Sequence, residues 1–216
     1  MTNSIQAKRK TRAAALIATS EKGRERIAAI LAAARDVLVE KDYTQFSLRN
    51  IAAAANIHLS NLQYYFPSRE ALIHALCADV VRQYEERYEE RFRPLPALPY
   101  PRFIAVLDYL IEDIREPRTR RFFVQMWALL ESADATGAGA LLEELYSAHI
   151  QNLADYIAEL NPGLARGACR QRAAMIAAMI EGMMLLLSNA DRELDAGEPR
   201  IELEMRKQLL RIATDS

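Results

Sequence analysis

Residues 47–72 have the sequence SLRNIAAAANIHLSNLQYYFPSREAL, and this stretch decides the fold. Ser47 has a short hydroxyl side chain that can accept a hydrogen bond from a free amide of a first helical turn, so it predicts the start of a short helix over 48–55. Asn56 follows, and asparagine tolerates the left-handed backbone conformation that a tight turn after a helix requires. A second short helix is predicted over 59–65, and Pro67 stops it because proline cannot continue a helix.

The apolar residues of this stretch predict how the two short helices pack. Ile51 and Ala52 share one face of the first helix, and Ile57 and Leu62 would hold the second helix against that face. Ala52 is small enough to allow two helices to cross closely at a steep angle. The other face of the second helix stays free to enter the major groove of DNA. The stretch therefore predicts a helix-turn-helix.

The rest of the chain also has the composition of helices, and we expect an all-α protein. Hydrophobic residues make up 51% of the sequence and only 7 of its 216 residues are glycine. Apolar residues recur at three- and four-residue steps, which predicts helices at 24–41, 69–92, 101–115, 117–134, 141–160, 165–192 and 201–212. Four prolines within 94–101 indicate a linker. We expect three parts: an arm at 1–22, a three-helix head at 23–68 and a helical body at 69–216.

Positive charge is concentrated in the N-terminal third of the chain. Residues 1–70 carry 11 Lys/Arg against 6 Asp/Glu, whereas residues 71–216 carry 17 against 23. This distribution favours a module that binds phosphate groups near the N-terminus. Lys8, Arg9, Lys10 and Arg12 make the arm basic, so it either tracks DNA or is a solvated tail. No signal peptide is predicted, because only a short apolar run follows these residues.

Other function classes find little support in the sequence. The most apolar stretch, 173–187, contains Glu181, so a buried helix is favoured over a membrane span. Cys77 and Cys169 fit no zinc pattern; we expect buried thiols in a reducing cytoplasm, with redox sensing as the alternative. An enzyme is a further alternative, but the chain contains no nucleophile elbow, phosphate loop or metalloprotease motif. We therefore expect no catalytic residues, no metal site and no cofactor.

The motif resembles the DNA-binding signature of the tetracycline-repressor (TetR) family. The resemblance rests on SLRNIA at 47–52, Asn56-Ile57 and SNLQYYFPSREAL at 60–72. It implies a cytoplasmic repressor that binds a palindromic operator in double-stranded DNA as a homodimer and releases it when a small-molecule effector binds. It also implies that 23–68 is the DNA-binding domain and that 69–216 binds the ligand and dimerises.

Four positions depart from the usual pattern of that family. Asn56 replaces a turn glycine, and His58 replaces the small hydroxyl residue that often opens the recognition helix. Gln63 replaces a frequent tyrosine, and Arg69 replaces a lysine. His58 and Gln63 lie where the family meets bases or phosphates, so they change the expected operator sequence rather than the fold.

Side-chain chemistry and the resemblance together suggest which residues contact DNA. Asn61 and Gln63 can each read the edge of an adenine with two hydrogen bonds. His58 can donate to a base or a phosphate, and the family would use the hydroxyl of Tyr64 for a phosphate. Ser47 and Arg69 lie at helix N-termini, which favour phosphate oxygens. The candidate DNA-binding residues are Ser47, His58, Asn61, Gln63, Tyr64 and Arg69.

The helical body holds most of the aromatic and methionine residues, which suit an adaptable apolar pocket or a plain core. We expect the effector to be largely apolar or aromatic. The favoured pocket residues are Phe123, Met126, Trp127 and Met179. The wider set that could line a cavity also contains Phe103, Tyr109, Phe122, Tyr146, His149, Tyr156 and Met175.

Glu181 is a lone carboxylate within an apolar helix and needs a partner. It could face a dimer interface, pair with an arginine or meet a cationic ligand, and Gly182 beside it would allow another helix to approach closely. The resemblance implies that the last two helices pair with their copies in a four-helix bundle. A wide apolar stripe fits this role: Ile176, Ile180, Met183, Met184 and Leu187. A DNA-binding regulator without a small-molecule effector remains the alternative, and a body without a cavity would favour it.

Overall fold

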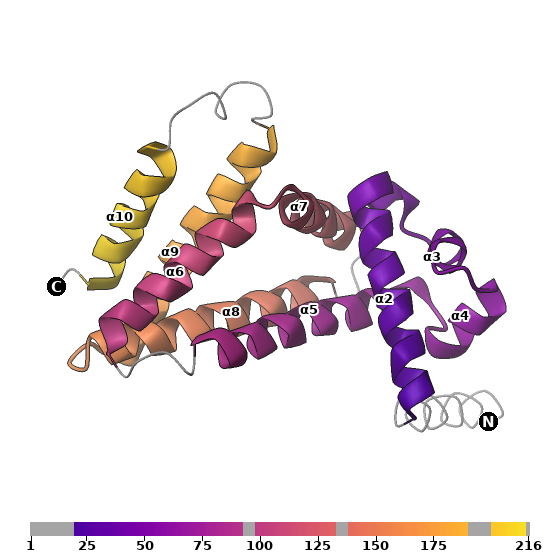
Figure 1. Ribbon diagram of the computed structural model, residues 1–216, viewed down its shortest axis with the longest axis horizontal. Coiled ribbons are helices and arrows are strands. Elements are labelled where there is room, and N and C mark those ends of the chain that lie inside the picture. The colour runs from indigo at the N-terminus through magenta and orange to yellow at the C-terminus, as the bar shows by residue number, and fades with distance from the viewer. Residues whose placement is uncertain (1–19, 93–97, 133–137, 190–199, 215–216) are drawn as a thin grey trace. The chain divides into compact units, whose positions relative to one another are not determined.

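The computed structural model describes residues 20–92, 98–132, 138–189 and 200–214. Every regular element in these ranges is helical, which confirms the expected all-α fold. The elements are α2 (Glu21–Lys41), the 3₁₀ turn η1 (Tyr43–Gln45), α3 (Leu48–Ala54), α4 (Leu59–Tyr65), α5 (Arg69–Phe92), α6 (Pro99–Arg115), α7 (Pro117–Ser132), α8 (Ala138–Leu160), α9 (Arg166–Asn189) and α10 (Arg200–Thr214) (Figure 1). Apart from residues 20–22, the expected basic arm lies outside the described residues.

The described residues form two compact units. Unit 1 contains residues 20–79 and 125–132, and unit 2 contains residues 80–124, 138–189 and 200–214. Helices α5 and α7 therefore each contribute residues to both units. The domain limits expected from the sequence stay a prediction.

Unit 1 contains the helix-turn-helix, which has the packing that the sequence predicts. The Ser47 hydroxyl accepts a hydrogen bond from the Asn50 amide at 3.2 Å and so caps α3. Ile51 and Leu62 have no exposed surface and Ala52 is 2% exposed, so α3 and α4 meet through these side chains. Ile57, expected to be fully buried, is only half-buried.

The turn between α3 and α4 depends on Asn56. Its φ is 51°, which lies in the left-handed region that the sequence analysis expected here. The next amide, that of Ile57, donates to the carbonyl oxygen of Ala52 at 2.9 Å. The turn thus satisfies one of the carbonyl groups that the end of α3 would otherwise leave without a partner.

A second backbone reversal follows α2 and was not expected. Asp42 has a φ of 87°, and its carboxylate accepts from the amide and the hydroxyl of Thr44 at 2.8 and 2.6 Å. Aspartate is among the few residues that adopt positive φ and satisfy nearby backbone groups with their own side chain. The Tyr43 amide donates to Gln125 Oε1 at 2.9 Å, so the second half of α7 holds this turn within unit 1.

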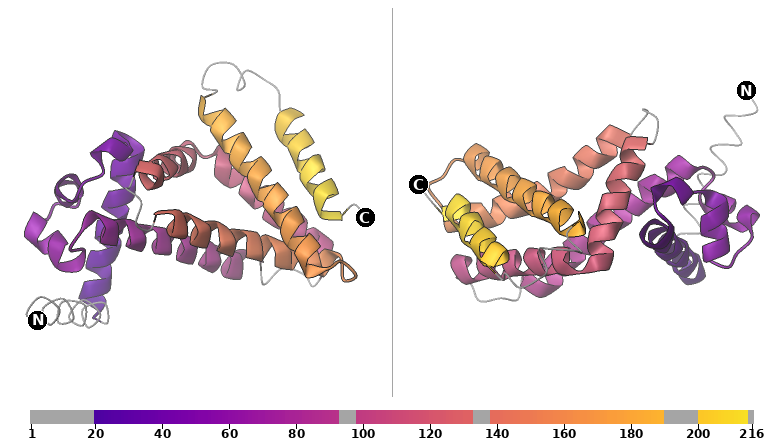
Figure 2. Two further views of the ribbon diagram at one scale, coloured as in Figure 1. Left: turned by 180° about the vertical axis from the view of Figure 1, so that it is seen from behind. Right: turned by 90° about the horizontal axis from the view of Figure 1, so that it is seen from above.

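Unit 2 is a helical bundle in which α8 packs along α9, and α6 contacts α8, α9 and α10. Figure 2 shows α10, in yellow, beside α9, in orange. Asn161, after α8, donates to the Ala213 carbonyl at 2.9 Å, and Arg206 of α10 pairs with Asp108 of α6. These contacts hold the last helix on the bundle.

Aromatic rings fill the end of this bundle where α5 stops. Tyr88 packs against Phe92, Tyr109 and Tyr156, with ring centroids 5.5, 6.4 and 6.3 Å away. Phe92 is 1% exposed, so the last turn of α5 belongs to the core. None of the helices in the described ranges combines the length and apolar character that a membrane crossing requires.

We expect the backbone conformation of Asn56 to determine what this position tolerates. Asn56→Ala places a β-carbon in the left-handed region and should lower the free energy of unfolding of unit 1 by about 1 kcal/mol, whereas Asn56→Gly should leave it nearly unchanged. Urea denaturation followed by tryptophan fluorescence measures this, because the single tryptophan, Trp127, lies in unit 1. Equal losses in the two variants would show that the amide side chain, and not φ, is what matters.

Candidate DNA-binding surface and ligand cavity

Helix α4 buries one face and exposes the other. Leu62 is fully buried, whereas its neighbours Asn61 and Gln63 are exposed and Tyr64 is 57% exposed. Tyr64 and Tyr65 contact each other edge to face, with ring centroids 5.4 Å apart. The exposed face therefore offers two amides and a phenol, which are groups that can hydrogen-bond to bases and phosphates.

The remaining candidate residues flank this face at the ends of the short helices. His58 occupies the N-cap position of α4, is exposed and makes no side-chain capping bond, so its imidazole stays available. Ser47 is half-buried at the N-cap of α3. Arg69 Nε donates to the Phe46 carbonyl oxygen at 3.0 Å, which joins the start of α5 to the segment before α3. Arg69 thus has a positioning role besides the predicted phosphate contact.

Two basic residues that the sequence analysis did not single out lie beside α4. Lys22 and Arg26, from the first turns of α2, line a hollow together with Asn61, Tyr64 and Tyr65. Both basic side chains are exposed. Positive charge next to the polar face of α4 is what a phosphate backbone requires. Lys22 and Arg26 are distant in sequence from α4. Their four-residue spacing places them on one face of α2, and this is the only signal that the sequence offers for them.

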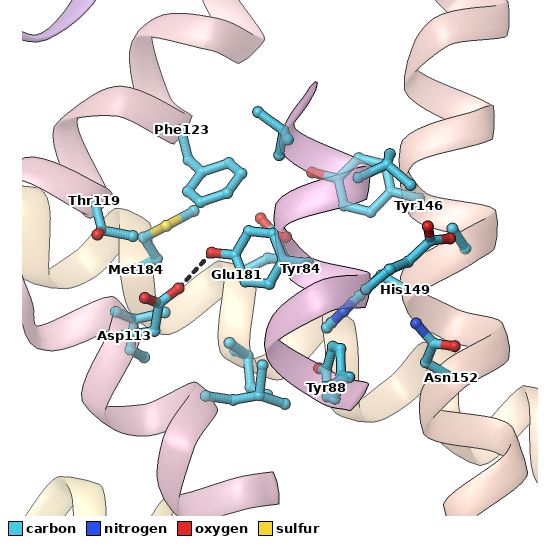
Figure 3. A pocket seen from close by; sticks show the side chains of 17 residues that line it. Tyr84, Tyr88, Asp113, Thr119, Phe123, Tyr146, His149, Asn152, Glu181 and Met184 are labelled. Atoms are coloured by element: carbon cyan, nitrogen blue, oxygen red, sulfur yellow. Dashed lines mark hydrogen bonds between the residues drawn. The ribbon is translucent and has the colours of Figure 1, made fainter. Parts of the chain in front are cut away.

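A cavity of about 80 Å³ lies within unit 2 (Figure 3). Five helices line it, and most of its surface is aromatic or aliphatic. The side chains with distinctive chemistry are Tyr84 and Tyr88 of α5, Asp113 of α6, Phe123 of α7, Tyr146, His149 and Asn152 of α8, and Glu181 and Met184 of α9. A mainly apolar concave space with a few polar groups is the usual form of a small-molecule site.

The predicted pocket residues are only partly brought together there. Phe123 lines the cavity, as do Tyr146 and His149 of the wider set. Met126, Trp127 and Met179 are not among its described lining residues; Met126 and Trp127 belong instead to unit 1, where Met126 is fully buried. Tyr84, Tyr88 and Asp113 were missed because the spacing of α5 and α6 indicates only that their apolar faces are buried.

Asp113 lines the cavity and has two partners. The Tyr84 hydroxyl donates to its carboxylate, as the dashed line in Figure 3 shows, and Arg87 Nη1 lies 3.7 Å from its Oδ1. Burial raises the pKa of Asp113, while the Tyr84 hydrogen bond and the Arg87 charge oppose the rise. Burial likewise raises the pKa of Tyr84 well above its ordinary value, so this hydroxyl stays protonated and can donate.

Burial is the main cause of the shifted pKa values of Glu181 and His149. Burial raises the pKa of Glu181 to about 7, against the opposing effect of a hydrogen bond from Tyr146. Burial lowers the pKa of His149 to about 4, so its imidazole is neutral at physiological pH. Glu181 Oε2 and the Tyr88 hydroxyl are both shielded from solvent and have no hydrogen-bond partner among the described residues.

Most of the apolar stripe that was expected to form a dimer interface is buried in the core of the single chain. Ile176, Ile180 and Met184 are at most 5% exposed and belong to the core of unit 2. A neighbouring stripe of α9 remains uncovered instead: Met175 is 55% exposed and Leu186 is 61% exposed. Gly182 faces open space on the same helix. Within the described residues, no group of three histidine, cysteine or acidic side chains could hold a metal ion.

Residues 30–76 match the family model described as bacterial regulatory proteins, tetR family. The match begins in α2 and ends in α5, so it contains the whole helix-turn-helix. The chain is also 31% identical, over 77 residues, to the HTH-type transcriptional regulator EthR of Mycolicibacterium smegmatis. That alignment covers 36% of each protein, so the chain spans little more than a third of this relative.

Solved structures share the fold over most of the chain. A putative transcriptional regulator from Saccharomonospora viridis, in complex with choline, has a TM-score of 0.66 at 18% identity and covers 87% of this chain and 94% of its own. FadR from Bacillus subtilis, a transcriptional regulator in complex with stearoyl-CoA, has a TM-score of 0.67 at 17% identity and covers 87% of this chain and 97% of its own. At these identities the likeness shows the fold.

The family matched by residues 30–76 and the relative are transcriptional regulators. Residues 30–76, with the whole helix-turn-helix, thus match the tetR family of bacterial regulatory proteins, and most of the chain shares the fold of solved transcriptional regulators.

Proposed function

We propose that the protein is a cytoplasmic repressor that binds a palindromic operator as a homodimer and releases it when a small molecule occupies the cavity of unit 2. The observation that carries the proposal is α4, which buries Leu62 while exposing Gln63 and Tyr64. A short helix pinned by one face with polar side chains on the other is the arrangement that reads a major groove. Lys22 and Arg26 add the positive charge that phosphates require.

The uncovered face of α9 supports a homodimer. Met175 and Leu186 on α9, and Leu203 on α10, are large apolar side chains that are more than half exposed. A second copy related by a two-fold axis would cover the same residues on both chains. Two recognition helices would then meet a palindrome, and each chain would raise the effective concentration of the other at the DNA.

Two observations support regulation by a ligand: the cavity itself, and the fact that α5 and α7, which line it, contribute residues to both units. Tyr84 of α5 and Phe123 of α7 line the cavity, and both helices continue into unit 1. A ligand that binds the DNA-free conformation more tightly than the DNA-bound one would lower operator affinity. A body without a cavity would support the alternative, a regulator without a small-molecule effector. The cavity therefore argues against that alternative. Solved neighbours in the fold hold ligands as different as choline and stearoyl-CoA, so the fold alone does not determine the ligand.

Gln63 should determine operator sequence. DNA selected from a random pool by the wild-type protein should be palindromic, and Gln63→Ala should lose about 1–3 kcal/mol of binding free energy to that site while relaxing the preference at one position of each half-site. Gln151→Ala, which changes an exposed glutamine of α8, is the control and should bind as the wild type does. If no sequence is enriched by the folded wild-type protein at low salt, the proposed function is wrong.

Lys22 should contact a phosphate rather than a base. Lys22→Ala should weaken binding to operator and random DNA alike and reduce the slope of log affinity against log salt by about 1. Lys41→Ala is a matched control, since this lysine lies at the other end of α2, roughly 29 Å away. Fluorescence anisotropy at several salt concentrations measures both slopes. An unchanged slope for Lys22→Ala, or an equal change in both variants, would contradict the proposed contact.

Charge on the uncovered face of α9 should separate the two chains. Leu186→Glu should yield a folded monomer in sedimentation experiments, because the side chain is exposed in the single chain. Its operator affinity should fall about a hundredfold or more, since the second half-site no longer benefits from linkage. Leu98→Glu tests an equally exposed leucine outside this face and should remain a dimer. A dimeric Leu186→Glu variant would show that the interface lies elsewhere.

A further inference from the structure

The cavity of unit 2 is acidic. Glu85, Asp113 and Glu181 line it, and no lysine or arginine belongs to its lining in the described part of the chain. Glu85 is exposed at the solvent side, so water screens its charge. The side chains of Asp113 and Glu181 are half-buried, and a carboxylate that is removed from water requires a compensating partner.

Asp113 has such partners, whereas Glu181 is only partly satisfied. The Tyr84 hydroxyl and the Arg87 guanidinium satisfy Asp113. Glu181 receives a hydrogen bond from Tyr146, but its Oε2 is shielded from solvent and accepts none from any described residue. The arginine partner that the sequence left open is absent from the described lining. Glu181 therefore presents one uncompensated carboxylate oxygen to a mainly apolar lining.

Aromatic rings line the same cavity as this acceptor. Tyr84, Tyr88, Phe123 and Tyr146 line the same cavity from α5, α7 and α8. Figure 3 shows the Tyr84 ring in the middle of the lining, with Phe123 and Tyr146 to either side. The negative faces of such rings attract cations, most strongly where water is excluded. Aromatic rings beside a carboxylate are the groups that recognise an alkylammonium head.

We propose that the cavity of unit 2 binds an organic cation, with Glu181 as its counter-charge and the aromatic rings as its walls. The inference rests on the proposed function of a ligand-responsive regulator and names the chemical class of its effector. At about 80 Å³ the cavity accommodates a compact head such as trimethylammonium. The sequence predicts a largely apolar or aromatic effector, and the proposal adds a positive charge to it. The apolar part of such an effector can contact the same aromatic walls.

Binding is coupled to the ionisation of Glu181. Its pKa of about 7 means that the ionised fraction rises from about 9% at pH 6 to about 91% at pH 8. A cation that needs the ionised form should therefore bind about tenfold more tightly at pH 8 than at pH 6. His149, with a pKa of about 4, is neutral throughout this interval. The other titratable or charged groups of the lining and its edge are Tyr84, Glu85, Arg87 and Tyr88 on α5, Asp113 on α6, and Tyr146 on α8.

Isothermal titration of the full chain with choline and with 3,3-dimethylbutan-1-ol tests the proposal, because the two probes differ in charge and hardly in shape. Benzyltrimethylammonium tests a larger body on the same head. The wild type should bind both cations at pH 8 at least tenfold more tightly than the alcohol, with the stated loss at pH 6. Since neither cation carries an ionisable proton, binding at pH 7 should release about half a proton from the protein, which titration in two buffers detects.

Glu181→Gln should abolish the pH dependence, weaken cation binding about tenfold at pH 8 and leave alcohol binding unchanged. Glu85→Gln makes the same chemical change at the exposed edge of the cavity and should alter cation affinity by less than about twofold. Circular dichroism establishes that both variants are folded. Cations that bind no better than the alcohol, or binding that Glu181→Gln leaves unaltered, would overturn the proposal.

Operator binding, measured in parallel, separates this inference from the proposed function. Without a cation, wild type and Glu181→Gln should bind operator DNA equally well. A protein that binds operator but does not favour the cations retains the proposed function and refutes the cationic effector. A protein that favours the cations through Glu181 but selects no operator supports the ligand class and refutes the proposed function.

Discussion

The burial of Leu62 against α3 determines what the rest of the N-terminal unit can do. Leu62 is fully enclosed, and Ala52 opposite it is small enough to let the two helices cross closely. Because side chains around a helix have fixed angular spacing, enclosing Leu62 exposes Gln63 and Tyr64. Asn56 is required for the same reason, since the turn must reverse the chain within a few residues and does so at positive φ.

The C-terminal unit contains a different constraint, a carboxylate with one shielded oxygen, Glu181 Oε2, that accepts no hydrogen bond from a described residue. A core built for stability alone would replace Glu181 by an apolar residue, since a buried acid without compensation destabilises the fold. Tyr84 and Phe123, which line the same cavity, lie on the two helices that contribute to both units. A molecule that changes the packing around these side chains therefore acts on helices whose other halves belong to the unit that carries α4.

The sequence predicts local features of this fold well and tertiary ones less well. The cap at Ser47, the turn at Asn56 and the end of α4 each depend on a few neighbouring residues, and the structure confirms them. Lys22 could not be predicted as a neighbour of Asn61, because only the packing of α2 joins residues so far apart in sequence.

The residues of the cavity also show that the sequence predicts local features better than tertiary ones. Phe123 and Met126 lie one turn apart on α7, and periodicity indicates that both are buried without indicating where. Packing places Phe123 in the cavity lining and Met126 in the core of unit 1. In α9 three residues of the predicted interface stripe are likewise core and the stripe beside it is uncovered, because successive side chains of a helix point about 100° apart and the sequence does not indicate which stripe the bundle covers.

In the proposed function, occupation of the cavity and occupation of the operator oppose each other. The most direct test is the affinity of fluorescently labelled operator DNA, measured with the cavity empty and with it saturated by a molecule whose binding calorimetry has established. Thermodynamic linkage requires that ligand and DNA weaken each other by the same factor, and we predict a factor of about five or more. Identical operator affinity with the cavity empty and filled would contradict the account.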